Sequence, residues 1–135
     1  MKVIITEKQK YNLSQLISEQ GKLPDGTKEE RIAEIEKRKK HIVKLVPKMV
    51  SYFKETFGDK IYEIKTELKG VYYAHESHSV KIPKISFYFS NDDNRILEKY
   101  KKDIRDDIKN LFNIDMGYYG VPLVAQFYKM NWEEF

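Results

Sequence analysis

The chain has 135 residues, which is enough for one domain and too few for two ordinary ones. Cysteine is absent, which excludes disulfides, thiolate metal ligands and a thiol nucleophile, and hydrophobic residues at 41% suffice for one core. The formal net charge of +4 is uneven, because residues 1–60 carry +5 and residues 61–135 carry −1. Any polyanion-binding surface is therefore expected in the N-terminal half.

We expect a soluble, cytoplasmic protein that makes no membrane contact. No apolar run approaches the roughly 20 residues that span a bilayer. The first seven residues also hold too short an apolar stretch for a signal peptide.

The first segment of the single domain, residues 1–26, predicts a strand, a helix and a loop. Val3–Ile5 is a short apolar run that is typical of a strand. Thr6 and Gln9 form a T-x-x-Q capping box, which predicts a helix over about residues 7–19.

The core of the domain, residues 27–135, begins with a long helical pattern. Thr27 and Glu30 form a second capping box, and Gly58 provides a stop after Thr56 and Phe57. Pro47 lies inside the pattern and lacks an N–H, which predicts either a kink or two abutting helices. The apolar positions, which recur every three or four residues and predict one buried face, are Ile42, Val46, Met49 and Phe53.

Two strands are expected to follow as a hairpin that turns at about Ala74–Ser79. In residues 61–73, uncharged side chains alternate with Glu and Lys, which predicts one buried and one solvated face. In residues 80–89, the apolar positions change parity at Pro83-Lys84, which predicts a bulge. Pro83 also favours an edge position, because proline cannot donate a hydrogen bond to a neighbouring strand.

A helix and a last strand complete the pattern. Asn91–Asn94 offers several N-caps for an amphipathic helix whose apolar positions run from Leu97 to Leu111. Residues 121–130 are apolar on both faces, which predicts the central strand of the sheet. The expected fold class is α+β, with two layers and helices on one face of a mainly antiparallel sheet. The element order is either the ferredoxin-like βαββαβ or an αββαβ variant.

The strongest charge feature is the basic run Lys37-Arg38-Lys39-Lys40-His41. On a helix, its side chains would lie opposite the apolar stripe and would neutralise phosphates, the sequence-independent part of nucleic-acid binding. The alternative is a solvated helix face, and the scarcity of Arg argues against base-specific readout. The candidate nucleic-acid-binding residues are Lys37, Lys40, His41, Lys44 and Lys48.

His75-Glu76-Ser77-His78 offers metal-ligand types in the predicted hairpin loop. Its spacing is one residue short of the H-E-x-x-H that places two His on one helix face, and a third ligand would have to come from elsewhere. An ordinary polar turn is favoured, so we expect no metal site and no cofactor. The chain also lacks a Walker motif, a G-x-S-x-G and a G-x-G-x-x-G, so we expect no enzymatic activity.

The sequence closes with Asn131-Trp132-Glu133-Glu134-Phe135. An acidic segment that ends in Phe resembles the terminal docking peptides of some bacterial and phage single-stranded-DNA-binding proteins, whose last carboxylate and ring enter a basic, apolar pocket on a partner. The resemblance implies partner docking through Trp132 and Phe135. The alternative is that both rings seal the core of this domain.

The opening, Met1-Lys2-Val3-Ile4-Ile5-Thr6-Glu7-Lys8-Gln9 with Leu13 and Leu16 behind it, resembles the start of many small uncharacterised proteins of tailed bacteriophages. The resemblance implies a phage-encoded virion, assembly or host-interaction factor and assigns no role to any residue. We therefore expect a non-enzymatic interaction protein that acts through protein–protein contacts, with a partner or with itself. The alternative is a basic nucleic-acid-binding module that uses the Lys-rich helix face.

Overall fold

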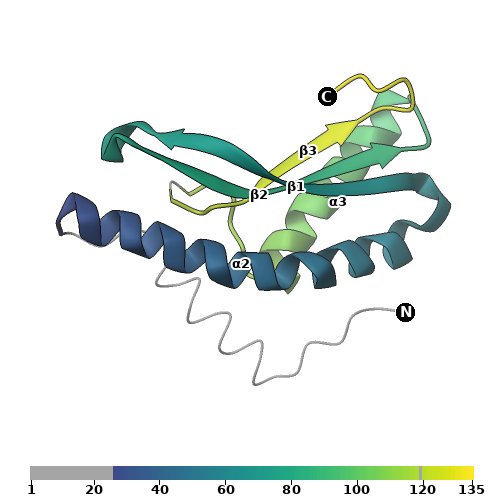
Figure 1. Cartoon of the computed structure of the whole chain (residues 1–135). Coiled ribbons are helices and arrows are strands. Elements are labelled where there is room, and N and C mark those ends of the chain that lie inside the picture. The colour runs from purple at the N-terminus through teal and green to yellow at the C-terminus, as the bar shows by residue number, and fades with distance from the viewer. Residues whose placement is uncertain (1–25, 119) are drawn as a thin grey trace.

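A computed structural model describes residues 26–118 and 120–135 of the chain. The expected strand at Val3–Ile5, the expected helix over residues 7–19 and the segment that resembles phage proteins lie outside the described residues. The described part confirms the α+β class and has the order αββαβ (Figure 1). Its elements are the helix α2 (Lys28–Phe57), the strands β1 (Ile61–Tyr73) and β2 (His78–Phe89), the helix α3 (Asn94–Leu111) and the strand β3 (Val124–Tyr128).

Local signals in the sequence define the ends of the helices. The hydroxyl of Thr27 accepts a hydrogen bond from the N–H of Glu30 at 3.2 Å, which satisfies an amide that has no partner inside the helix. Asp93 caps α3 in the same way by accepting from the N–H of Arg95 at 3.0 Å. After α2, Gly58 takes a φ of +54°, a conformation that favours glycine.

The helix α2 is continuous over 30 residues and passes through Pro47, so the expected division into two abutting helices does not occur. Pro47 lies on the exposed side of the helix. The carbonyl that loses its hydrogen bond there belongs to Val43, which is also exposed, so water can satisfy it. Within the described part of the chain, neither helix is both long enough and apolar enough to cross a bilayer.

The sheet has the strand order β1-β2-β3 and is mixed rather than mainly antiparallel. β1 and β2 form an antiparallel hairpin, whereas β2 and β3 are parallel from Lys84↔Val124 to Tyr88↔Tyr128. A parallel pair needs a crossover connection, and α3 is that crossover. Among the described strands the central one is therefore β2, and not residues 121–130 as the sequence suggested. Part of their apolar character belongs to Val121 and Leu123, which are buried in the loop before β3.

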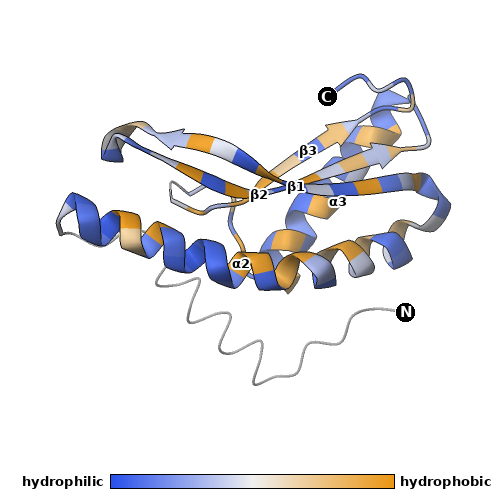
Figure 2. Cartoon of the chain, in the orientation of Figure 1, coloured by the Kyte–Doolittle hydropathy of each residue, from blue (hydrophilic) through white to orange (hydrophobic). Residues whose placement is uncertain are grey.

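Both helices pack on one face of the sheet, and their apolar residues recur at the spacing of helical turns (Figure 2). Phe53 of α2 meets Phe87 of β2 edge-on at 5.4 Å between ring centroids, and Phe87 stacks on Phe127 of β3 at 5.3 Å. Ile104 and Ile108 of α3 are fully buried in the same core. This core fixes which face of the sheet remains uncovered by α2 and α3.

The buried positions of β2 change parity at Pro83, as the sequence predicts, but there is no bulge at that point. The β1–β2 register is unbroken from Glu63 to Tyr73, and its one shift lies between Ile61 and Glu63. Instead, the hairpin twists along its length (Figure 1), as two-stranded ribbons do strongly. In the first half of β2, the face that turns toward α2 is thus the one opposite to that of Phe87, and Ile82 joins Ile35 of α2 in a small buried cluster there.

β1 lacks the fully buried face that its alternating sequence predicts. Tyr62 and Leu68 are 46% and 55% exposed, because β1 is an edge strand of the described sheet and much of it extends past the main core formed with the helices. The edge character predicted for Pro83 agrees with its position, because pairing with β3 begins only at the next residue, Lys84.

Candidate functional site: an aromatic cluster on the open face of the sheet

The face of the sheet that α2 and α3 leave uncovered carries aromatic side chains. Register partners in neighbouring strands project from the same face, so Tyr88 and Tyr128 lie together, opposite the core residues Phe87 and Phe127. Their rings stack with centroids 4.7 Å apart and planes 9° apart. Only 8% of Tyr88 is exposed, because further rings cover it.

Tyr62 and Trp132 are those further rings. The ring centroids of Trp132 and Tyr62 lie 5.1 and 6.0 Å from that of Tyr88, and 6.3 Å from each other. The three rings therefore contact one another, yet Trp132 remains 58% exposed and Tyr62 46% exposed. We call Tyr62, Tyr88, Tyr128 and Trp132 the aromatic cluster.

A lysine of β1 places its charge over this cluster. The Nζ atom of Lys65 lies 5.1 Å from the ring centroid of Tyr88 and 5.3 Å from that of Trp132, which are cation–π distances. The carboxylate of Glu63 lies 3.9 Å from the same Nζ. Desolvation, followed by the charge of Glu63, raises the pKa of Tyr62, while Lys65 lowers it in part. Tyr62 is therefore neutral at physiological pH.

Residues 129–135 place Trp132 by folding back along β3. The N–H of Lys129 donates to the carbonyl of Glu133 at 2.8 Å, and the N–H of Phe135 donates to the carbonyl of Phe127 at 3.1 Å. Trp132 lies in the resulting turn with a φ of +68°, a left-handed conformation that bulky residues seldom adopt and that costs about 1–2 kcal/mol. The turn thus holds the indole over Tyr88 at a cost in backbone energy.

The two candidate partner-docking residues have different surroundings. Phe135 lies on the core side of the sheet, with its ring centroid 5.9 Å from that of Phe89 and 6.2 Å from that of Phe127. Trp132 lies on the open face instead. The sequence alternative in which both rings seal the core thus describes Phe135 but not Trp132.

The candidate nucleic-acid-binding residues also differ among themselves. Four lysines of α2 are exposed on the side of the helix turned away from the sheet, whereas His41 is half-buried. The Nε2 atom of His41 is enclosed and has no hydrogen-bond partner among the described residues. Burial, followed by the charge of Lys44, lowers the pKa of His41, so its ring is neutral at physiological pH and adds no positive charge. The exposed row, here called the lysine ridge, is Lys37, Lys40, Lys44 and Lys48.

Arg38 belongs to the same basic run in the sequence but is fully buried. One terminal nitrogen, Nη1, donates to the carbonyl of Gly120 at 3.2 Å, and Nε donates to the carboxylate of Glu34 at 3.3 Å. Desolvation lowers the pKa of Arg38, and Glu34 offsets part of this effect. Arg38 thus ties α2 to the loop before β3 and is not part of the lysine ridge.

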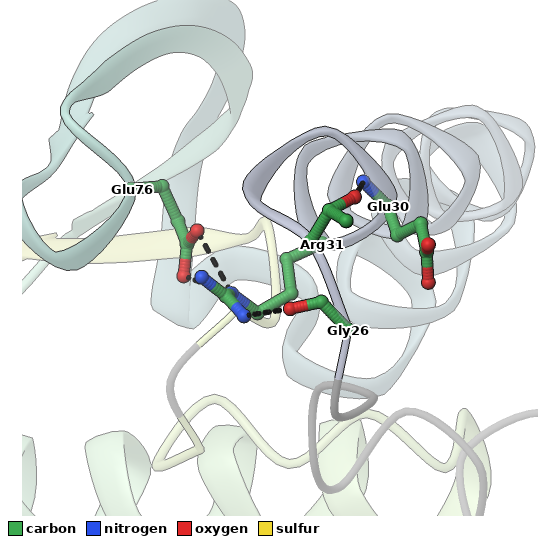
Figure 3. A network of polar contacts seen from close by, with 5 residues as sticks. Gly26, Glu30, Arg31 and Glu76 are labelled. Atoms are coloured by element: carbon green, nitrogen blue, oxygen red, sulfur yellow. Dashed lines mark hydrogen bonds and ion pairs between the residues drawn. The ribbon is translucent and has the colours of Figure 1, made fainter.

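The predicted hairpin loop uses its carboxylate in an ion pair. Glu76 is buried, and both of its carboxylate oxygens lie 2.9 Å from Nε of Arg31 in the first turn of α2 (Figure 3). Arg31 also donates through Nη1 to the carbonyl of Gly26 at 2.6 Å. Among the described side chains, which do not include that of His75, no three or more His, Asp or Glu residues come together as a metal site.

The sequence pointed to Trp132 by its position but did not reveal the ring cluster. The sequence nevertheless held a signal for the cluster, because Tyr88 lies between Phe87 and Phe89, and Tyr128 follows Phe127. Aromatic residues at the solvated positions of two strands indicate an aromatic open face once the strands are known to be neighbours. Comparisons of the chain with protein families, with curated proteins and with solved structures found no match.

Proposed function

We propose that this chain is a non-enzymatic interaction protein that binds a protein partner through the aromatic cluster. The proposal rests on the exposure of Trp132 and Tyr62, 58% and 46%, while both rings are held against Tyr88. Trp and Tyr are enriched at the energetic centres of protein interfaces. Such a role suits a virion, assembly or host-interaction factor, the kind of protein that the opening residues resemble.

The order of the cluster before binding supports the proposal. Each ring contacts at least one other ring, so little side-chain freedom remains to be lost on association. The left-handed backbone of Trp132 supports it further, because strained conformations gather at functional sites. Burial in the core does not repay this strain, since more than half of the Trp132 side chain stays exposed.

The charges on the open face favour a protein over nucleic acid as the partner of the cluster. A polyanion requires an excess of positive charge, and the described residues of this face carry only two lysines against three glutamates. Moreover, α2 covers the other face of the sheet, and the lysine ridge lies on the side of α2 that is turned away from the sheet. The positive charge of the ridge therefore does not add to that of the cluster. The charged residues of the open face, where the three strands lie side by side, are Lys65, Lys84, Glu63, Glu67 and Glu134.

Affinity capture with matched variants tests the proposal. The wild type is compared with the double variant Tyr62→Ala/Trp132→Gly, using a lysate of the cells in which the protein acts, with and without nuclease. Glycine suits the left-handed φ at position 132, so this change removes the indole without adding strain. Tyr72→Ala is the control, because Tyr72 is a 62% exposed tyrosine near the far end of β1.

We expect a specific protein to be captured by the wild type and by Tyr72→Ala, to be lost from the double variant, and to be unaffected by nuclease. Capture that survives in the double variant would refute the cluster as the binding surface. Circular dichroism of each variant shows whether the fold is retained.

A second candidate function is sequence-tolerant binding of nucleic acid by the lysine ridge. It is favoured by one observation, the exposure of all four lysines on the side of α2 opposite its buried stripe. Binding of this kind depends on phosphate contacts alone, so it is weak and strongly dependent on salt. In the capture experiment it would appear as nuclease-sensitive recovery that the double variant retains.

A further inference from the structure

We propose that the aromatic cluster recognises a basic side chain of the partner, an arginine or a lysine, at the position that Lys65 occupies in the free protein. This inference rests on the proposed function and names the chemistry of the partner. The cluster already holds a cation, because Nζ of Lys65 lies over the rings of both Tyr88 and Trp132.

The geometry allows one cation to replace the other. Apart from the two rings, the contact described for the Lys65 ammonium is the carboxylate of Glu63, 3.9 Å away on the same strand, and the Lys65 side chain is 49% exposed. An exposed ion pair of this length contributes little, so the ammonium group can leave the rings at small cost. The ring faces of Tyr88 and Trp132 then become available to a planar guanidinium, which stacks on aromatic faces better than an ammonium does.

The surrounding charge favours a cationic occupant. With two lysines and three glutamates among its described residues, the open face has a small negative excess, and this excess grows when the ammonium of Lys65 moves away. Glu63 then provides a carboxylate beside the rings, which is the usual setting for recognition of a cation. An acidic or phosphorylated partner would meet repulsion from the same groups.

A peptide titration of the purified chain tests the inference. The probe is acetyl-Gly-Arg-Gly-amide, and the matched control peptide carries citrulline, which has nearly the shape of arginine but no charge. Trp132 is the only tryptophan of the chain, so its fluorescence reports binding at the cluster directly. The Lys65→Met variant removes the internal cation and keeps most of the length of the side chain. Lys69→Met removes an equal charge from the same strand, at an exposed residue for which no ring contact is described.

We expect the arginine peptide to bind more tightly than the citrulline peptide, and Lys65→Met to increase its affinity about 2- to 5-fold, the factor of an exposed cation–π contact. Lys69→Met should give a smaller increase, and Tyr88→Leu, if it keeps the native circular dichroism, should abolish the preference for arginine. An equal gain in the two lysine variants, or no preference for arginine in Lys65→Met, would overturn the inference.

The two proposals fail in distinguishable ways. If capture of the partner depends on Tyr62 and Trp132 while the peptides show no preference for charge, the interaction proposal stands and the cation inference is wrong. If the Tyr62→Ala/Trp132→Gly variant still captures the partner, the interaction proposal is wrong whatever the peptides show.

Discussion

Arg31 and Glu76 are 45 residues apart in the sequence, yet Nε of Arg31 lies 2.9 Å from both carboxylate oxygens of the buried Glu76. This ion pair joins the first turn of α2 to the tip of the β1–β2 hairpin (Figure 3). It holds the part of the hairpin that β3 does not reach, where the ribbon packs on α2 through Ile35 and Ile82.

Removing only the cation of this pair should destabilise the protein more than removing both partners. Arg31→Met leaves a buried carboxylate without its ion-pair partner, and we expect the free energy of unfolding to fall by about 2–3 kcal/mol. Arg31→Met/Glu76→Met removes the charge as well and should recover part of that loss. Urea unfolding at pH 7.5 measures both, and equal losses in the two variants would show that the pairing is energetically unimportant.

The lowered pKa of His41 predicts that the free energy of unfolding decreases in mild acid. Burial and Lys44 lower the pKa of His41 in the folded state below the unfolded value of about 6.5. The neutral ring therefore makes its full contribution to the free energy of unfolding above that pH. As the pH falls below about 6.5, the unfolded state takes up the proton first, and the free energy of unfolding decreases toward the folded-state pKa.

Urea unfolding of the wild type and His41→Leu at pH 7.5 and 5.5 checks the pH effect of His41. The variant should lose this part of the pH dependence and be at least as stable at pH 7.5, because an enclosed nitrogen without a described partner is removed. An unchanged pH profile in His41→Leu would assign the effect to other groups.

Substitution by alanine should change the free energy of unfolding in opposite directions at two glycines. Gly58→Ala places a side chain at a φ of +54° and ψ of −124°, and we expect a loss of about 1–3 kcal/mol although space is available around it. Gly70 has no such conformation and also faces open space, so Gly70→Ala should be neutral or slightly stabilising. Thermal unfolding of both variants compares them, and similar melting temperatures would contradict the role of the backbone at Gly58.

The rings of Phe135 and Trp132 should contribute unequally to stability. Phe135→Ala removes contacts with Phe89 and Phe127, and we expect a loss of about 2 kcal/mol because the ring is only half-buried. Trp132→Gly removes a mostly exposed ring and also relieves the left-handed backbone, so the loss should stay below about 1 kcal/mol. A larger loss for Trp132→Gly would mean that the indole is a structural element rather than a binding surface.

Reversing two charges on the lysine ridge separates its function from folding. Lys40→Glu/Lys44→Glu should change the free energy of unfolding by less than about 0.5 kcal/mol, because both side chains are exposed. If the ridge binds duplex DNA through four phosphates, the log–log slope of affinity against salt is about −3.6, and the double reversal abolishes binding. Binding that is insensitive to salt, or that survives the reversal, would identify the ridge as only a solvated helix face.

The sequence by itself determined the elements of this fold, because their signals are local. The hydroxyl of Thr27 caps α2 as predicted, Gly58 follows its end, and the two long strands lie close to their predicted positions. Such signals depend on residues a few positions apart and on side-chain periodicity, and both can be read from the chain before it folds.

Only the tertiary structure decided which residues meet. Arg38 looks like its lysine neighbours in the sequence, but it is buried and donates a hydrogen bond to the carbonyl of Gly120, 82 residues away. Likewise, Tyr62, Tyr88 and Trp132 come from β1, β2 and the turn after β3. Local patterns do not encode the order of the strands or the face to which a turn returns, since these follow from packing between distant segments.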